Sequence, residues 1–205
     1  TVHAIPGVLV APWINKFYIM DLSPGISLVR YLVGQGFTVF VTSWRNPGPE
    51  AKETTLENYV LGGVLPALAA ARAICGVPQV HAAGYCLGGT ALAMLLAWLA
   101  ADPEGQDVSH NPVAHWSSLT TLVDFSDPGA IGAFLSEGSL DFLQERMAVR
   151  GYLDGADMAS AFRLLRPNSL IWHYVVHRYL YGEALAPNEV LFWNCDATRM
   201  PAAMH

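Results

Sequence analysis

The chain has 205 residues, of which 53% are hydrophobic and 14% are charged, with a formal net charge of −6. This length allows one large domain, or a core with a small cap. The negative charge and the scattered lysines and arginines exclude a nucleic-acid backbone as the main ligand, because neutralising phosphates requires clustered basic residues. The three cysteines are widely spaced and form no C-x-x-C pair. This pattern argues against a disulfide framework or a structural zinc site and favours a reducing, cytoplasmic compartment.

The start of this sequence shows no pattern of a cleavable signal. The first residues, Thr1-Val2-His3, lack the basic region and apolar core of a cleavable signal, and they do not include an initiator methionine. The longest apolar run, Ala91–Ala101, is too short to cross a bilayer, so we expect no transmembrane segment. These features predict a segment cut at both ends from a longer protein.

Short apolar runs alternate with helical patterns over the first 120 residues. The predicted strands are Gly7–Ala11, Phe37–Val41, Gln79–Ala83 and Val113–Thr121, and the predicted helices are Ser27–Gln35, Thr55–Ala71 and Leu87–Ala101. Strands separated by helices of this length form a parallel sheet that is covered on both faces. The sequence therefore predicts an α/β fold.

The alternation ends near Asp124, after which helical patterns follow one another without strands. The predicted helices are Leu140–Val149, Asp157–Leu164 and Ser169–Leu180. We therefore divide the chain into a core, residues 1–123, and a mostly helical cap above the sheet, residues 124–205. The cap holds more aromatic residues than three short helices need for packing. We expect it to be a mobile lid that keeps water from a site beneath it.

The residues Gly-Tyr-Cys-Leu-Gly-Gly at 84–89 lie between a predicted strand and a helix rich in Ala and Leu. This is a nucleophile elbow, G-x-nucleophile-x-G, with Cys86 in place of serine. So sharp a turn needs small neighbours on both sides of the nucleophile. The macrodipole of the helix would favour a thiolate at Cys86, and the N–H of Leu87 would face an oxyanion. The alternative is a buried cysteine in a turn whose glycines serve only close packing.

The elbow and several other strings resemble those of the polyhydroxyalkanoate synthases, in the same order over nearly the whole chain. The strings are Pro12–Pro24, Ser43–Pro47, Gly84–Thr90, Thr121–Phe125, Leu165–Asn168 and Phe192–Pro201. The single-chain type that makes poly-3-hydroxybutyrate is the best match. The resemblance implies an α/β-hydrolase fold and an acyltransferase that polymerises (R)-3-hydroxyacyl-CoA with release of CoA. It implies Cys86 as the residue that carries the acyl group, and no cofactor.

Further expectations follow from the same resemblance. It implies hydroxyacyl-CoA and a growing polyester as partners, a homodimer, and a cytoplasmic location at the surface of polymer granules. It places a second oxyanion donor at the backbone N–H of Ile14, in the loop after the first strand. Asp21 matches a carboxylate near the active site of the family, although a role in the turn before Ser23-Pro24 is equally open. The triad Asp and His of the family have no counterpart among these 205 residues.

Other acids and histidines are candidates for catalysis, and each has a simpler interpretation. Asp124 follows a strand, where some α/β-hydrolases place the triad acid, but a turn residue is the simpler interpretation. His173 and His177 share one face of a helix, yet they lack the Glu and the third ligand of a zinc motif, so we assign no metal. The position of His205 relative to Cys86 cannot be derived from the sequence.

Cys75 and Cys195 lack a glycine elbow, and we expect them to be inert small hydrophobic residues. Two other functions are compatible with the elbow. One is a thioesterase or depolymerase that uses the same cysteine and transfers the acyl group to water. The other is a non-catalytic subunit related to the synthases, although the cysteine at the elbow argues against it.

Overall fold

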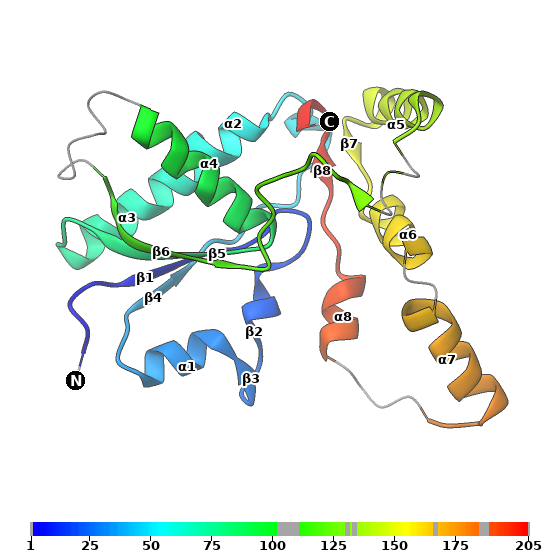
Figure 1. Cartoon of the computed structure of the whole chain (residues 1–205), viewed down its shortest axis with the longest axis horizontal. Helices are drawn as coiled ribbons and strands as arrows, with labels where there is room; N and C mark the ends of the chain where they lie inside the picture. The colour runs from blue at the N-terminus through cyan, green and yellow to red at the C-terminus, as the bar shows by residue number, and fades with distance from the viewer. Residues whose placement is uncertain are drawn as a thin grey trace.

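The computed structural model describes residues 2–101, 111–129, 132, 135–165, 168–184 and 189–204. Its central sheet has four parallel strands in the order β4-β1-β5-β6 (Figure 1). The strands are β1 (Gly7–Val10), β4 (Val39–Val41), β5 (Val80–Tyr85) and β6 (Val113–Leu119). β1 pairs with both β4 and β5, so the first strand of the chain lies inside the sheet. The predicted α/β class is confirmed.

Helices cover both faces of this sheet. They are α1 (Leu28–Gly34) on one face and α2 (Leu56–Tyr59), α3 (Leu65–Cys75) and α4 (Leu87–Ala101) on the other (Figure 1). Alternate residues of β1 serve the two faces, as the period of a strand requires. Val8 and Val10 pack in the larger cluster with α3 and α4, whereas Leu9 lies in the smaller cluster against α1. The buried run that predicted β1 therefore reflects a strand covered on both sides.

One long apolar helix spans Leu56–Cys75, with a π-helical segment, η3 (Val60–Val64), between α2 and α3. It begins at a capping box in which Thr55 and Asn58 bond each other's backbone N–H groups. By length and composition alone this helix is able to cross a membrane. Its buried residues, among them Val64 and Leu68, pack against the sheet in the larger core cluster. Its apolar face thus belongs to the core.

Short elements connect the core strands. They are η1 (Phe17–Met20), the antiparallel pair β2 (Asp21–Ser23) and β3 (Ile26–Ser27), and η2 (Pro49–Ala51). The sequence did not predict them, because segments of two to four residues carry no periodic pattern.

The region after residue 124 lies beyond the carboxyl ends of the strands (Figure 1). Its elements are α5 (Glu137–Arg150), β7 (Tyr152–Leu153), α6 (Gly155–Leu165), η5 (Asn168–Trp172), α7 (His173–Val175), η6 (Val176–Leu180), α8 (Glu189–Cys195), β8 (Met200–Pro201) and η7 (Ala202–Met204). The expectation of helices without strands was wrong, since β7 and β8 pair antiparallel across about fifty residues of sequence. The sequence analysis also missed α8.

Backbone and side-chain contacts join this region to the core. The N–H of Ala203 donates to the carbonyl of Lys52 at 2.9 Å, and the N–H of Arg199 donates to Oδ1 of Asn46 at 2.9 Å. Within the region, the guanidinium of Arg146 binds both carboxylate oxygens of Asp157, which ties α5 to α6. The end of the described chain thus returns to the loop that follows β4.

Candidate active site

Cys86 occupies a sharp turn between β5 and α4. Its φ angle is 54°, which is in the left-handed region. This conformation is strained for any residue other than glycine. Its N–H donates to the carbonyl of Leu119 at 2.9 Å. Its carbonyl accepts hydrogen bonds from the N–H groups of Gly89 at 2.9 Å and Thr90 at 3.2 Å. These hydrogen bonds hold the strained backbone on both sides of Cys86, so they fix the position from which its side chain projects.

The glycines of the elbow are required by close backbone approach. A Cβ at Gly84 would overlap Gly89, and a Cβ at Gly88 would overlap the carbonyl of Val10. A Cβ at Gly89 would overlap the side chain of Thr121. Close packing therefore explains the glycines, as the simpler interpretation expected. It does not explain the left-handed conformation of Cys86, which is an additional feature of the turn.

A cavity of about 190 Å³ opens at Cys86. Four segments far apart in the sequence supply its lining: the elbow, the loop after β1, helix α6, and α8 with the residues after it. The lining residues are Ile14, Asn15, Cys86, Met158, Ala159, Trp193, Asn194 and Ala197. Most of this lining is apolar, and among the described residues it includes no histidine or carboxylate. The predicted nucleophile and the predicted oxyanion residue Ile14 thus face the same space.

The loop after β1 is bound to the segment after α8. The side chain of Trp193 donates from Nε1 to the carbonyl of Lys16 at 2.7 Å. Asn15 and Ala197 form an antiparallel bridge. Thr198 donates from its N–H to the carbonyl of Ile14 at 3.0 Å. The loop that carries Ile14 is therefore held from the side of the cap as well as by β1.

The two predicted oxyanion donors occupy suitable backbone positions. Leu87 is the first residue of α4, so its N–H has no acceptor within the helix. None of the hydrogen bonds found in the described part of the chain uses the N–H of Ile14. Leu87 follows Cys86 directly in the chain, and Ile14 lines the same cavity as Cys86, so both backbone donors remain candidates for the oxyanion site.

The two candidate carboxylates make local hydrogen bonds and do not line the cavity at Cys86. Asp21 accepts a hydrogen bond from Oγ of Ser27 at 2.5 Å, and Ser27 is itself the N-cap of α1. Asp124 accepts from the N–H of Ser126 at 2.9 Å, and this bond lowers the pKa of Asp124. Asp124 thus makes the turn contact of its simpler interpretation, whereas Asp21 lies in strand β2 and bonds the residue that caps α1.

The candidate histidines lie together, His173 in α7 and His177 in the adjoining η6. The rings of His173 and His177 are 4.3 Å apart, and each makes an edge contact with a neighbouring tyrosine. Nδ1 of His177 lies 2.6 Å from a carboxylate oxygen of Glu183. Within the described ranges, no group of three or more His, Cys, Asp or Glu residues is arranged to hold a metal ion. His205 lies outside the described residues.

The other two cysteines are separate from the elbow. Cys75 ends α3 and Cys195 ends α8, and neither lines the cavity at Cys86. The sequence analysis did not find the cavity residues of α6, Met158 and Ala159, because they have no chemical signature. The residues Trp193, Asn194 and Ala197 did lie in a matched string, but that string gave no position relative to Cys86.

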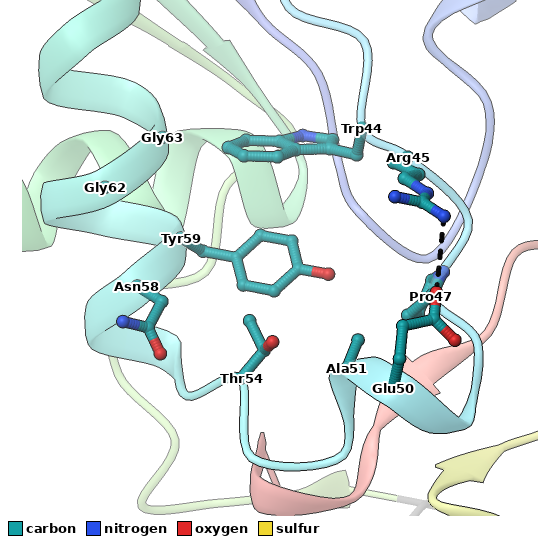
Figure 2. Close-up of a pocket in the computed structure, with 10 residues that line it drawn as sticks. All are labelled: Trp44, Arg45, Pro47, Glu50, Ala51, Thr54, Asn58, Tyr59, Gly62 and Gly63. Atoms are coloured by element: carbon teal, nitrogen blue, oxygen red, sulfur yellow. Dashed lines mark hydrogen bonds and ion pairs between the residues drawn. The ribbon is translucent and has the colours of Figure 1, made fainter.

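A larger cavity, of about 360 Å³, lies beside α2 and does not include Cys86. Figure 2 shows the rings of Trp44 and Tyr59 on its wall, with the ion pair of Arg45 and Glu50 at one side. The ring centroids of Trp44 and Tyr59 are 4.9 Å apart, and burial raises the pKa of Tyr59. Nε1 of Trp44 donates to the carbonyl of Ala11 at 2.7 Å. This wall therefore supports the start of the loop that carries Ile14.

Solved structures share this fold. A carboxylesterase structure from Nitrososphaera gargenis matches with a TM-score of 0.50 at 14% identity, covering 99% of this chain and 62% of that one. A protein of Sulfolobus solfataricus described as a candidate lipase matches with a TM-score of 0.51 at 14% identity, covering 98% and 65%. At such low identity the likeness shows only the fold, and it confirms the expected α/β-hydrolase class.

Sequence relatives cover the whole chain. The poly(3-hydroxyalkanoate) polymerase of Methylorubrum extorquens is 47% identical over 205 residues, which are 100% of this chain and 33% of that protein. The poly(3-hydroxyalkanoate) polymerase subunit PhaC of Cupriavidus necator is 42% identical, over 98% of this chain and 34% of its own length. A family model described as the N-terminus of poly-beta-hydroxybutyrate polymerase matches residues 1–32. The resemblance expected from the motifs is confirmed, and the chain is a relative, over its whole length, of about one third of a poly(3-hydroxyalkanoate) polymerase.

Proposed function

We propose that the protein containing this chain polymerises (R)-3-hydroxyacyl-CoA into polyhydroxyalkanoate, with Cys86 as the residue that carries the acyl group. The observation that supports this most directly is the strained elbow, which presents a thiol to a cavity shared with Ile14. The names of the relatives identify the product class, and the elbow supplies a nucleophile for it.

In the first half of the cycle, Sγ of Cys86 attacks the thioester carbonyl of hydroxyacyl-CoA. The thiol proton passes to a general base and then to the sulfur of CoA, which leaves as the carbon–sulfur bond to it breaks. The negative charge on the tetrahedral oxygen is stabilised by the N–H groups of Leu87 and Ile14. The cavity lining supplies no histidine or carboxylate, so we assign the base to none of these lining residues.

In the second half, the hydroxyl oxygen of another hydroxyacyl group attacks the thioester on Cys86. An ester bond forms, the bond to sulfur breaks, and the hydroxyl proton returns to the thiol through the base. Sulfur suits this cycle because a thioester remains as activated as the acyl group was on CoA, whereas an oxygen ester does not.

The apolar lining of the cavity favours transfer to a hydroxyacyl group over transfer to water. Met158, Ala159 and Trp193 come from the cap and enclose the space above the thiol. Their position supports the role of residues 124–205 as a lid, because closing them over Cys86 excludes water from the thioester. A cytoplasmic homodimer at the surface of polymer granules, with CoA thioester and polyester as its ligands, is part of the same proposal.

Substitution of the three cysteines tests the assignment of the nucleophile. The assays use the full-length protein, because the relatives that the chain matches are about three times as long. Cys86→Ala should lower CoA release by a factor of at least about 10⁴, as removal of a covalent nucleophile does elsewhere, and should abolish acyl-enzyme labelling detected by mass spectrometry. Cys75→Ala and Cys195→Ala, the matched controls, should retain both.

The outcomes also separate the alternative functions. Equal loss at all three cysteines, with the fold preserved, contradicts the assignment of Cys86. Release of free hydroxy acid without polymer, still dependent on Cys86, supports a thioesterase or depolymerase. If the unmodified protein is folded but shows neither CoA release nor acyl labelling, that result supports a non-catalytic subunit.

A further inference from the structure

Thr198, in the segment after α8, makes two hydrogen bonds to the loop after β1. Its hydroxyl donates to the carbonyl of Trp13 at 2.5 Å, and its N–H donates to the carbonyl of Ile14. Thr198 is 2% exposed, so these are buried bonds without competition from water. A buried hydroxyl that donates to a loop carbonyl, far away in the sequence, needs an explanation.

The carbonyl of Trp13 and the N–H of Ile14 belong to one peptide unit. The described chain contains no cis peptide bond, so this unit is planar and trans. In a trans unit the C=O and the N–H point in opposite directions. A hydrogen bond that fixes the carbonyl of Trp13 therefore also fixes the direction of the N–H of Ile14, on the opposite side from Thr198.

The direction of the N–H of Ile14 matters because Ile14 lines the cavity at Cys86. Ile14 lines the cavity at Cys86, whereas Thr198 lies behind the loop and does not line it. A peptide unit whose C=O accepts a hydrogen bond is polarised, and its N–H becomes a stronger donor. We infer that Thr198 is a positioning residue for catalysis, which aims the N–H of Ile14 at the oxyanion that forms on Cys86. The inference rests on the proposed function and extends it to a residue far from the elbow.

A second hydrogen bond provides an internal comparison. The hydroxyl of Tyr18 donates to the carboxylate of Asp196 at 2.7 Å, which links the same two segments. This bond acts on side chains and does not touch the peptide unit of Trp13 and Ile14. If the contacts serve only to hold the segments together, losing either bond should have similar effects. If Thr198 orients the donor, only its loss should slow the chemical step.

The test compares three variants of the full-length protein in steady-state assays with hydroxybutyryl-CoA. Thr198→Val keeps the shape and removes the hydroxyl, so kcat should fall by about tenfold or more, with KM changed less than about twofold. The upper bound is the loss of a complete oxyanion donor, about 10² to 10³ in kcat. Thr198→Ser restores the hydroxyl and should recover most of kcat. Tyr18→Phe should keep kcat within about twofold of the unmodified protein.

Each outcome decides between the two roles. A fall in kcat for Thr198→Val that serine rescues, at equal thermal stability of the two variants, supports positioning. Equal kcat for all three variants, or a fall that tracks only the melting temperature in all of them, overturns it. The Cys86→Ala variant distinguishes this failure from failure of the proposed function. If Cys86→Ala is inactive and Thr198→Val is fully active, the nucleophile stands and the positioning role is wrong.

Discussion

Replacing Gly88 by alanine tests how closely α4 must approach β1 for the elbow to hold Cys86. A Cβ at position 88 would overlap the carbonyl oxygen of Val10 and lie 2.7 Å from that of Ala11. Both oxygens are backbone atoms at the end of an inner strand, so no side chain can rotate away. An ordinary Cβ contact is at least 3.4 Å. To clear the oxygen of Val10, the first turn of α4 must therefore move by about 1.3 Å, and Cys86 precedes it directly.

The expected cost has two parts. Overpacking of this kind destabilises a protein by about 1–3 kcal/mol. A displacement of about 1 Å at a reacting group lowers the rate by about 10²-fold, so we expect a loss of activity of that order for Gly88→Ala. The matched control is Gly62→Ala, in the helix Leu56–Cys75, where a Cβ meets no atom within 4 Å. That variant should be more stable by about 0.4–1 kcal/mol and keep its activity.

The assay combines urea unfolding with CoA release and acyl-enzyme labelling of the full-length variants. Gly88→Ala should lower the unfolding midpoint and, separately, slow the labelling of Cys86 under conditions where the variant is fully folded. If Gly88→Ala unfolds at the same midpoint and labels at the same rate, the close approach of α4 to β1 does not position the nucleophile. The reasoning from the elbow glycines would then be refuted.

Two further predictions concern pH and the cap. Burial, with the hydrogen bond and charge of Asp196, raises the pKa of Tyr18 to about 12 from 10.0, so the unfolded state loses this proton first. The protonated Tyr18 therefore stabilises the folded state below pH 10, and this stabilisation is lost between pH 10 and about 12. In Tyr18→Phe, the urea concentration at the midpoint of unfolding should depend less on pH over this range. In hydrogen exchange, residues 168–181 should exchange faster than β5, and a substrate analogue should slow exchange in α6 and α8. Equal protection of the cap and β5, without response to ligand, would make the cap a static part of the core.

The core and the elbow could be predicted because their signals are local. Each predicted strand of the sheet is present, because a short apolar run between two predicted helices is typical of a strand buried on both faces. Helix Leu87–Ala101 has the predicted bounds, and the helix predicted to open at Thr55 does begin there, with a capping box that the structure reveals. The sharp turn at Cys86 was predicted because a nucleophile elbow needs small residues at fixed spacing, and the structure shows the atoms that Gly84 and Gly88 approach.

The cap was harder to predict for a physical reason. Strands β7 and β8 have two residues each and exist only because the chain returns to pair them, so neither has a pattern of its own. Helix α8 has seven residues, which is too short for a clear helical period. Motif matching located the string Phe192–Pro201, but a match does not say what the string contacts.

The relation between the oxyanion loop and Thr198 shows where sequence reasoning reaches its limit. The hydroxyl of Thr198 and the carbonyl of Trp13 are separated by 185 positions, and a donor to a backbone carbonyl leaves no signature in the residue that supplies the carbonyl. The hydrogen bond depends on the hydroxyl of Thr198, whereas the group that it orients is the peptide unit that contains the N–H of Ile14. If the orientation matters, selection acts on a threonine in the cap to control a backbone N–H in the core. Under our proposal the cap would both cover Cys86 and complete its oxyanion site, and one segment would then control lid position and catalytic competence.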